Sequence, residues 1–394
     1  MKRFWLFAFI LLIPVQLARH FWPEWSLVMG LRVDYLAPKI FFLDLIWFLM
    51  VMGYRKEFFK KKIEVGIIFL LVTVFVNSLV AEVWQLALLR WLRIFQAGSV
   101  LVIISKEREY IAEKLKTIIP YWVLIEGFLA LAQVVKGGSL QGIFYFLGER
   151  KFTLSTIGIA QMSLGGEELL RAYGTFSHPN SLAGFLMMSL LLWEKVAKKK
   201  DFFWWMVWWS GVMGIVLAGS RVIWAFLALY WLYKGWKSFK GTRKRLGMLM
   251  IMSGVFLLCF SAMAINYRAS DFLGGWDKES ISKRWELMVI AFKMWRQNLW
   301  FGVGANNFLV RLPEYLNKNG VLWLQPVHNI FLYIVSELGI LGSIALGWLI
   351  WERKWWRKEG KLLMIGLLVI SGLFDHYWFS LWQNWWLALL VLAL

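Results

Sequence analysis

His328 and Asn329 are the residues of this sequence best suited to chemistry. They follow Pro326 and stand where a polar segment ends and a strongly apolar run begins. A histidine in such a place can take a proton from a hydroxyl group near neutral pH, so His328 is a candidate general base. Asn329 could orient a sugar or a phosphate beside it. The structural alternative is that both side chains cap the helix that follows.

A second histidine has a similar setting. His178, Pro179 and Asn180 also end a polar stretch and open an apolar run. Proline suits the first turn of a helix, so a cap and a turn are one interpretation. The functional interpretation places His178 and Asn180 in the polar wall of the cavity that holds His328. His376 lies in a polar and aromatic segment and is a further candidate for that wall.

Three arginines, Arg171, Arg221 and Arg284, stand near the ends of apolar runs. A guanidinium group can bind phosphate oxygens through two parallel hydrogen bonds. Three of them together could therefore hold a diphosphate without a metal ion. The alternative is that each contacts lipid headgroups at the membrane surface. Convergence of the three on one site depends on helix packing, which the sequence does not show.

Several other chemistries are disfavoured. The four histidines have no H-x-x-x-H or similar spacing, so we expect no metal ion. The single cysteine, Cys259, excludes an intrachain disulfide framework and a cysteine metal cluster. A glycine-rich phosphate loop with Lys-Ser/Thr does not occur, which disfavours a cytoplasmic ATPase or kinase. We therefore predict an activity without a cofactor.

Five charged residues fall inside apolar runs. Such charges are costly in a membrane and normally face the bundle interior or a wet cavity. Arg90 and Arg93 lie one helical turn apart and could pair with Asp44 or Glu126, or extend the anion site; the fifth is Glu337. We favour a structural ion pair.

The composition is typical of an integral membrane protein. Hydrophobic residues make up 60% of the chain, which has 28 Trp and a mean hydropathy of +0.59. About twelve apolar runs are long enough to span a bilayer. The first of them is interpreted as a retained helix, because no cleavage site follows it. The prediction is an all-α polytopic membrane protein with one transmembrane domain over residues 1–394. The expected spans are 4–19, 37–53, 63–80, 84–104, 117–135, 180–194, 202–219, 222–234, 247–266, 328–350, 362–375 and 379–393.

Lysine and arginine residues gather in every second loop between these runs. The positive-inside rule makes those loops and both termini cytoplasmic. The net charge of +20 is then explained by basic cytoplasmic loops that contact anionic lipids. Nucleic-acid binding is disfavoured. The loops at 136–179 and 267–327, together with all four histidines, fall on the outer face. The second of these loops is expected to carry one or two helices at the surface.

Several segments in order make the chain resemble the O-antigen ligase and O-antigen polymerase superfamily of bacterial envelope glycan assembly. They cover about residues 170–345, and the first 140 residues are similar only in their pattern of spans. One departure is that Asn298-Leu299 stands where the family often has Asn-Pro. The matching segments are 171–180, 219–221, 284–285, 298–308, 328–329 and 337–342.

The resemblance implies a membrane glycosyltransferase bundle of the GT-C type, with a long outer loop as a lid over the site. It implies an oligosaccharide donor on undecaprenyl diphosphate, transferred without metal and with inversion at the periplasmic face of the bacterial inner membrane. In that picture His328 resembles the catalytic base. Arg221 and Arg284 resemble diphosphate-binding arginines, and Arg171 a further member of the basic cluster.

The predicted function is transfer of the oligosaccharide to an acceptor hydroxyl. The acceptor would be another lipid-linked repeat in a polymerase, or a different lipid, glycan or protein in a ligase, and the sequence does not decide between them. The alternative is a transporter or flippase of lipid-linked glycan, with the buried charges lining its path. It is disfavoured because the sequence shows no repeated halves. A structural scaffold would leave His328 and the outer arginines unexplained.

Overall fold

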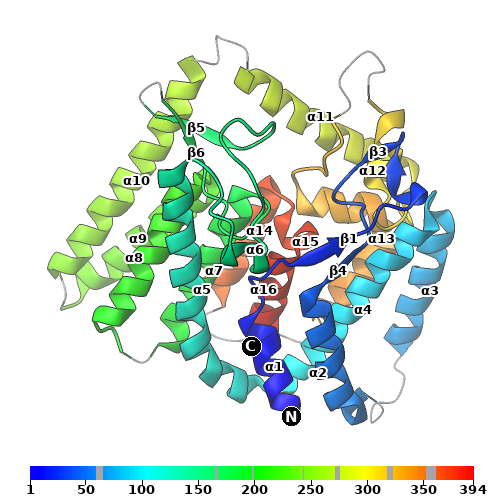
Figure 1. The fold of residues 1–394 in the computed structure, drawn as a ribbon, viewed down its shortest axis with the longest axis horizontal. Helices are drawn as coiled ribbons and strands as arrows, with labels where there is room; N and C mark the ends of the chain where they lie inside the picture. The colour runs from blue at the N-terminus through cyan, green and yellow to red at the C-terminus, as the bar shows by residue number, and fades with distance from the viewer. Residues whose placement is uncertain are drawn as a thin grey trace.

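The computed structural model describes residues 1–58, 65–164, 167–197, 199–242, 244–270, 276–316, 323–351 and 361–394. Within these ranges the chain forms a bundle of helices with three small antiparallel ribbons of two strands each (Figure 1). The prediction of a helical fold is confirmed, and the ribbons are an addition that the sequence did not predict.

The helices follow the predicted apolar runs closely. Their bounds are α1 Lys2–Leu11, α2 Phe42–Phe58, α3 Val65–Val80, α4 Trp84–Lys106, α5 Arg108–Lys136, α6 Ile143–Phe146, α7 Pro179–Val196, α8 Phe202–Ala218, α9 Arg221–Lys240, α10 Lys244–Ser270, α11 Trp276–Gln297, α12 Phe308–Arg311, α13 Ile330–Trp351, α14 Leu362–Phe374, α15 Tyr377–Ser380 and α16 Trp382–Ala393. Two short 3-10 helices are η1 Glu24–Ser26 and η3 Leu312–Glu314.

The first predicted span is shorter than expected, because α1 ends at Leu11 and a strand, β1, begins at Ala18. Pro14 lacks the amide hydrogen that a continuing helix would need. The three ribbons lie between helices. They pair β1 (Ala18–His20) with β4 (Lys39–Phe41), β2 (Leu27–Val28) with β3 (Leu31–Arg32), and β5 (Gln161–Leu164) with β6 (Glu167–Leu170).

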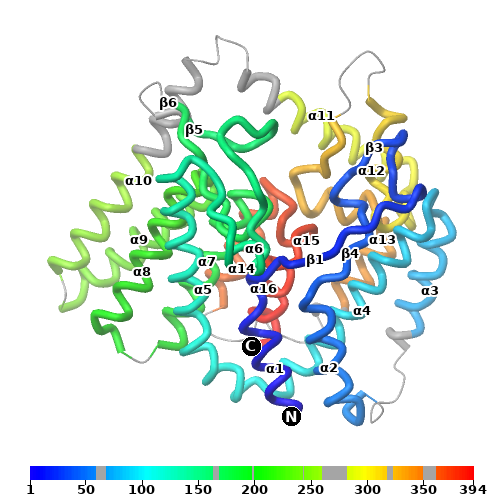
Figure 2. The backbone as a smooth tube through the Cα atoms, in the orientation of Figure 1, coloured from blue at the N-terminus to red at the C-terminus, as the bar shows by residue number. Residues whose placement is uncertain are grey.

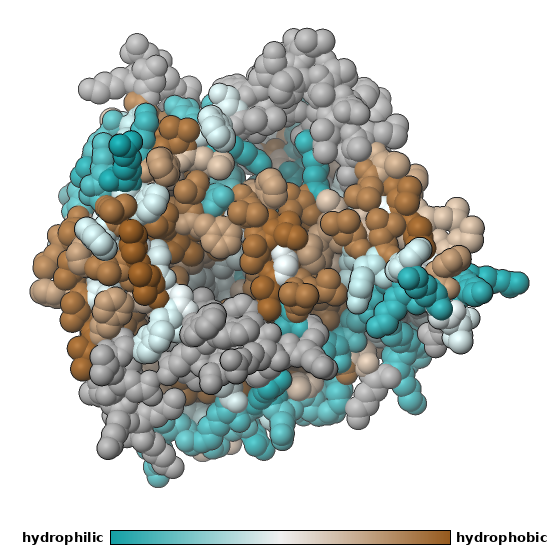
Figure 3. All heavy atoms as spheres, turned by 180° about the vertical axis from the view of Figure 1, so that it is seen from behind, coloured by the Kyte–Doolittle hydropathy of each residue, from teal (hydrophilic) through white to brown (hydrophobic). Residues whose placement is uncertain are grey.

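Among the residues that the structure describes, three helical segments are long and apolar enough to cross a membrane, namely Trp84–Lys106, Arg108–Lys136 and Ile330–Trp348. Shorter apolar helices occur at Ile68–Val80, Phe202–Ala218 and Leu362–Phe374. Figure 3 shows hydrophobic side chains as a broad band across one face of the molecule. These features agree with a multi-pass membrane protein, while the number of twelve spans and their orientation stay predictions.

Helix α7 lies between α5 and α16 in the bundle (Figure 1). It is buried from Pro179 to Trp193 apart from Asn180, and it packs against α5, α8, α9, α14 and α16. A helix that is apolar on all sides must be enclosed by protein or by lipid, and α7 is enclosed by other helices. The enclosure fixes the position of its first turn, and therefore of the polar residues there.

Helix α13 contains a sharp kink. Gly339 has φ 64° and ψ −169° inside the helix, a backbone conformation that favours glycine. The segment 298–308 packs against this kink, with Val303 N donating to Ser336 O at 2.9 Å and Ile340 N donating to Leu299 O at 3.0 Å. Two motifs that the sequence analysis singled out, 298–308 and 337–342, therefore lie side by side.

Both termini lie in the lower half of the molecule in Figure 2, whereas α11 and the ribbon of β5 and β6 lie at the top. The predicted outer loops and the termini are thus at opposite ends of the bundle.

Candidate functional site

His328 lies immediately before α13, in a polar cluster. Its side chain is 12% exposed, and its Nδ1 atom is 3.8 Å from Oδ1 of Asp375. Its ring centroid is 5.3 Å from that of His376. Nδ1 of His328 is buried and has no hydrogen-bond partner within the described ranges. The structure thus brings the predicted base together with His376 and with a carboxylate.

Asp375 ends α14 and is buried. Its Oδ1 accepts a hydrogen bond from the backbone amide of His376 at 2.7 Å, and its Oδ2 accepts one from Asn180 Nδ2 at 2.8 Å. Burial alone would raise the pKa of this carboxyl, but the neighbouring His328, His376 and His178 hold that pKa well below its usual range. Asp375 is therefore an anion at neutral pH. The sequence predicted the segment from Asp375 to Trp378 only as lining of the cavity, and it did not predict that Asp375 is a partner of His328.

Asn180 connects this carboxylate to an arginine. Its Oδ1 accepts a hydrogen bond from Arg171 Nη2 at 2.6 Å, while Nδ2 donates to Asp375. Arg171 Nε donates to the backbone oxygen of Ala218 at 2.8 Å. A polar chain therefore runs from Arg171 through Asn180 and Asp375 to His328. Arg171 and His328, both predicted site residues, are thus connected through the predicted Asn180 and through Asp375.

His178 caps α7, since its Nδ1 accepts a hydrogen bond from the backbone amide of Asn180 at 3.2 Å. Burial is the main cause that lowers the pKa of His178 to about 4, and the nearby positive charges of Arg171 and Arg284 lower it further against Asp375. His178 is therefore neutral at pH 7. The capping interpretation is confirmed, and the residue also borders the cluster.

His376 is enclosed by aromatic rings and a hydroxyl. Its Nδ1 is hydrogen-bonded to Ser380 Oγ at 2.5 Å, and its ring lies 5.5 Å from Tyr35 and 6.2 Å from Tyr333. Burial lowers the pKa of His376 to about 3 despite the opposing charge of Asp375. This neutral ring forms the packed wall behind His328.

Asn329 caps α13 with its side-chain oxygen, which accepts hydrogen bonds from Phe331 N and Leu332 N, each at 3.0 Å. Its Nδ2 donates to Leu373 O at 3.3 Å. Both ends of the amide are thus used within the protein, as the capping interpretation expects. The contact also ties the turn that carries His328 to the end of α14, close to Asp375.

Arg221 is the first residue of α9 and is partly buried. It follows Gly219, which has φ 65° and ends α8. A Cβ atom on Gly219 would lie 3.0 Å from Arg171 Nε, so Arg171 packs directly on this turn. Arg284 lies on α11 and is exposed, and its charge contributes to the lowered pKa of both His178 and His376. Arg171 and Arg284 therefore border the histidines, and Arg221 directly follows the turn that Arg171 contacts.

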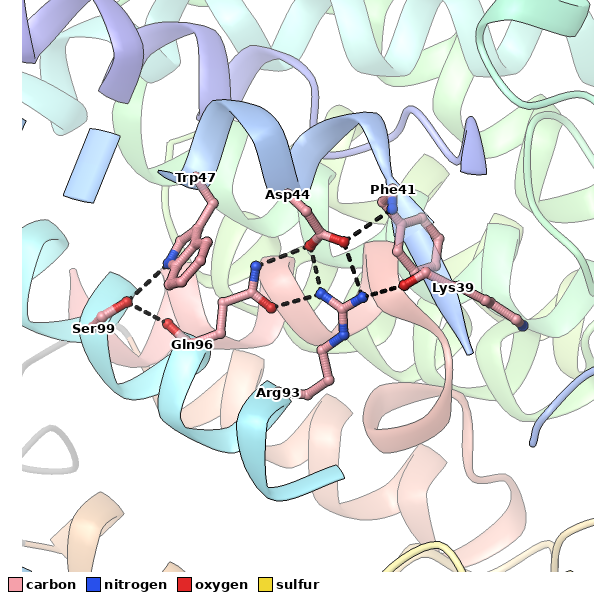
Figure 4. A network of polar contacts seen from close by, with 7 residues as sticks. All are labelled: Lys39, Phe41, Asp44, Trp47, Arg93, Gln96 and Ser99. Carbon is pink, nitrogen blue, oxygen red and sulfur yellow. Dashed lines mark hydrogen bonds and ion pairs between the residues drawn. The ribbon is translucent and has the colours of Figure 1, made fainter. Parts of the chain in front are cut away.

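Two of the charges in the apolar runs pair with each other. Arg93 Nη2 lies 2.9 Å from Asp44 Oδ2, Nη1 contacts Oδ1, and Gln96 donates to the same carboxylate at 2.9 Å (Figure 4). Arg93 Nη2 also donates to Lys39 O at 2.6 Å. Glu126 accepts hydrogen bonds from the backbone and the hydroxyl of Thr175. The structural interpretation is confirmed for Arg93 and Asp44.

Arg90 has a different environment from Arg93. It donates to Asn306 Oδ1 at 3.1 Å, to Tyr333 OH at 3.3 Å and to Phe379 O at 3.2 Å. Because Tyr333 contacts His376, Arg90 supports the wall behind the histidines.

His328, Asp375 and His376 offer potential metal-ligand atoms that all lie within 4.8 Å of one another. The chemistry around them does not suit a cation well. Asp375 already accepts hydrogen bonds with both oxygens, and His376 Nδ1 is bonded to Ser380. The charge of Arg284 adds repulsion. The expectation of a metal-free site stays a prediction.

Residues 205–347 match the family model described as O-antigen ligase. The matched range contains Arg221, Arg284 and His328, whereas Asn180 precedes it and Asp375 follows it. No curated protein matches the chain.

Proposed function

We propose that this chain, whose residues 205–347 match the O-antigen ligase family model, is an enzyme that transfers an oligosaccharide from undecaprenyl diphosphate to an acceptor hydroxyl. The transfer needs no metal ion and inverts the anomeric centre. The observation that carries the proposal is the cluster of His328, Asp375 and Asn180, with Arg171 at its far end.

His328 acts as the general base. It takes the proton of the acceptor hydroxyl as the oxygen forms its bond to the anomeric carbon. The bond from that carbon to the diphosphate breaks, and undecaprenyl diphosphate leaves with the electron pair. Protonation gives His328 a positive charge, which the Asp375 carboxylate stabilises from 3.8 Å. The same carboxylate restrains the ring in its orientation.

The arginines act on the leaving group. A diphosphate is a good leaving group once its charge is neutralised, and guanidinium groups aimed at its oxygens supply this without a metal. Arg221 approaches from the start of α9, Arg284 from α11, and Arg171 from the segment after β6, where it contacts the turn between α8 and α9. Asn180 connects Arg171 to the carboxylate that stabilises the protonated base. The same residue therefore helps to position both the leaving-group arginine and the base.

The site works at the periplasmic face of the bacterial inner membrane, with both termini in the cytoplasm and the segment 267–327 as a lid. The support for this orientation is that α11, which lies in that segment, and the termini are at opposite ends of the bundle (Figure 1). The alternative, a transporter or flippase, is less well supported. Arg93 and Asp44 would line its path, but they are used in a pair with each other.

The test uses purified protein in nanodiscs, supplied only with undecaprenyl-diphosphate oligosaccharide from its own pathway. A ladder of lengthening glycans that disappears in His328→Ala would support a polymerase with this base. Products that form only after a separate acceptor is added would support a ligase. Full activity of His328→Ala would overturn the mechanism, and movement of the donor across the bilayer without transfer would overturn the function.

A further inference from the structure

Residues 171–178 form an irregular segment between β6 and α7, which we call the strap. Arg171 is its first residue, and Asn180 follows it in the first turn of α7. The mechanism above uses these two side chains but not the backbone that carries them. The position of both depends on what holds the strap in place.

The backbone amides of the strap are all paired at its start. The first two donate to the backbone oxygens of Ala160 and Leu217, at 3.1 and 2.9 Å. The next three, at positions 173–175, donate to side chains of α5 instead. Buried irregular backbone needs such partners, because an unpaired amide away from water is costly. The strap is therefore held by specific side chains and not by regular secondary structure.

Gln133 of α5 is the partner of two of these amides. It is fully buried, and its Oε1 accepts hydrogen bonds from Tyr173 N at 3.0 Å and from Gly174 N at 2.8 Å. Its Nε2 donates to Gly174 O at 2.9 Å and to Glu149 Oε1 at 2.8 Å. A side-chain amide has two donor hydrogens and two acceptor lone pairs, so Gln133 makes every hydrogen bond available to it.

Glu149 determines which way this amide points. Its buried carboxylate also accepts hydrogen bonds from the backbone amides of Leu140 and Gln141, at 2.8 and 2.5 Å. Because the group accepts from all three neighbours, the nitrogen of Gln133 faces Glu149 and the oxygen faces the strap.

Glu126 holds the next residue of the strap. It lies two turns before Gln133 on the same face of α5, and it accepts hydrogen bonds from Thr175 N at 3.0 Å and from Thr175 Oγ1 at 2.7 Å. Gly174, between the two contacts, has φ 58°, and a Cβ atom there would collide with Glu126. The strap thus lies directly against α5, at a position that suits only glycine.

The other side of the strap reaches the turn between α8 and α9. Arg171 Nε donates to Ala218 O at 2.8 Å, and Arg171 Nη2 donates to Asn180 Oδ1 at 2.6 Å. Helix α5 packs against both α7 and α8 (Figure 1). The strap therefore connects Gln133 on one helix to the arginine that faces the donor.

We propose that Gln133 is a positioning residue for the donor diphosphate, because it holds the backbone that carries Arg171. This inference rests on the proposed function and adds to it a residue that touches no substrate. Holding an arginine in place before binding removes the cost of ordering it when the ligand arrives. Without Gln133, Arg171 keeps its charge but loses its fixed position, so the affinity for diphosphate falls.

The first experiment measures amide hydrogen exchange in nanodiscs without a ligand. In Gln133→Met the strap should exchange about tenfold faster than in the parent, as expected when one or two net hydrogen bonds are lost. The matched control is Gln96→Met, since Gln96 is also a buried helical glutamine, bonded to Asp44. This control should leave the exchange of the strap unchanged. Gln133→Asn, which is one methylene shorter, replaces Gln133→Met where that variant does not fold.

The second experiment measures the binding of inorganic pyrophosphate to the same proteins. Gln133→Met should weaken it by about tenfold, whereas Gln96→Met should bind as the parent does. Arg171→Gln should weaken binding by at least as much as Gln133→Met. Because Gln133 acts through Arg171, the double variant should bind no more weakly than Arg171→Gln alone.

Two results would overturn the inference alone. One is parent-like exchange of the strap in Gln133→Met. The other is faster exchange with parent-like pyrophosphate affinity, or with losses that add up in the double variant, while Arg171→Gln binds weakly.

A different result concerns the proposed function. If Arg171→Gln binds pyrophosphate as tightly as the parent, the donor site is assigned wrongly, and the role of Gln133 in donor binding falls with it. The behaviour of Arg171→Gln therefore distinguishes the two failures.

Discussion

Asn180 donates a hydrogen bond to Asp375 at 2.8 Å, although the two residues are 195 positions apart in the chain. This contact joins the first turn of α7 to the end of α14. Because Asn180 also accepts from Arg171, and Asp375 lies 3.8 Å from His328, one pair of residues connects Arg171 to His328, the proposed base. The predictions below follow from this arrangement.

His328→Ala should lower kcat by about 10²- to 10⁴-fold, the usual contribution of a general base, while donor binding is retained. The matched control is His178→Asn. Asparagine can replace the cap that His178 provides for α7, so this variant should stay within a few-fold of the parent. The measurement is glycan transfer together with donor binding. Equal losses in the two variants would argue that His328 is only a structural cap.

Asp375→Asn should lower kcat by about 10²-fold or more, because the protonated His328 loses its counter-charge. The KM for the donor should change much less. A readout beyond activity is the pH profile of kcat/KM, whose acidic limb, where the general base becomes protonated, should move in the variant. Glu314→Gln is a control at an exposed carboxylate, and it should behave as the parent. An unchanged pH profile in Asp375→Asn would count against the role given to Asp375.

Gly339→Ala should destabilise the protein by about 1–3 kcal/mol or more. An alanine at this position would keep the positive φ of Gly339, and its Cβ would collide with the backbone of Trp300 and Gly302. Gly347→Ala, on the same helix, is the matched control because no atom lies within 4 Å of its new Cβ. The measurement is the melting temperature in nanodiscs. Equal melting temperatures for the two variants would contradict the kink described here.

Treatment with EDTA should leave the transfer rate unchanged, because the arginines neutralise the diphosphate in place of a metal. The assay is run after exhaustive chelation and again with added Mg²⁺, Mn²⁺ or Zn²⁺. A loss of activity that one of these ions restores would make the three ligand atoms around His328 a metal site after all.

Acidification from pH 7 to pH 5 should lower the melting temperature. The folded-state pKa of His376 is about 3, below the unfolded value of 6.5. As the pH falls through 6.5 the unfolded chain takes up a proton and the folded chain does not. The contribution of His376 to the free energy of unfolding is therefore complete above pH 6.5 and is lost progressively as the pH falls toward 3. At pH 5 this loss is about 2 kcal/mol. His376→Gln should show a smaller pH dependence, and an identical one would contradict the assignment.

The sequence predicted the helices well because long apolar runs leave the chain few other choices in a membrane. It also predicted that His328, Arg171 and Arg284 share one end of the bundle, since polar breaks between apolar runs are few. The ribbon of β1 and β4 was missed, because a three-residue strand has no periodicity to detect.

The role of Asp375 was missed for a different reason. Its neighbours in the sequence form an aromatic turn that gives no sign of a partner, and the contact with Asn180 depends on how α7 and α14 pack. Distances across the bundle are set by packing and are not encoded in any local pattern.

The placement of Asn180 and Asp375 outside residues 205–347 limits how this enzyme can be divided or recombined. A chimera that received only the matched range would inherit the base and two arginines without the carboxylate and amide that align them. Exchange of acceptor preference between relatives would instead be sought at positions away from Asn180, Asp375 and His328, so that the proposed base and its supporting residues stay intact. Chemistry and selectivity would then be separable traits carried by different stretches of one polypeptide.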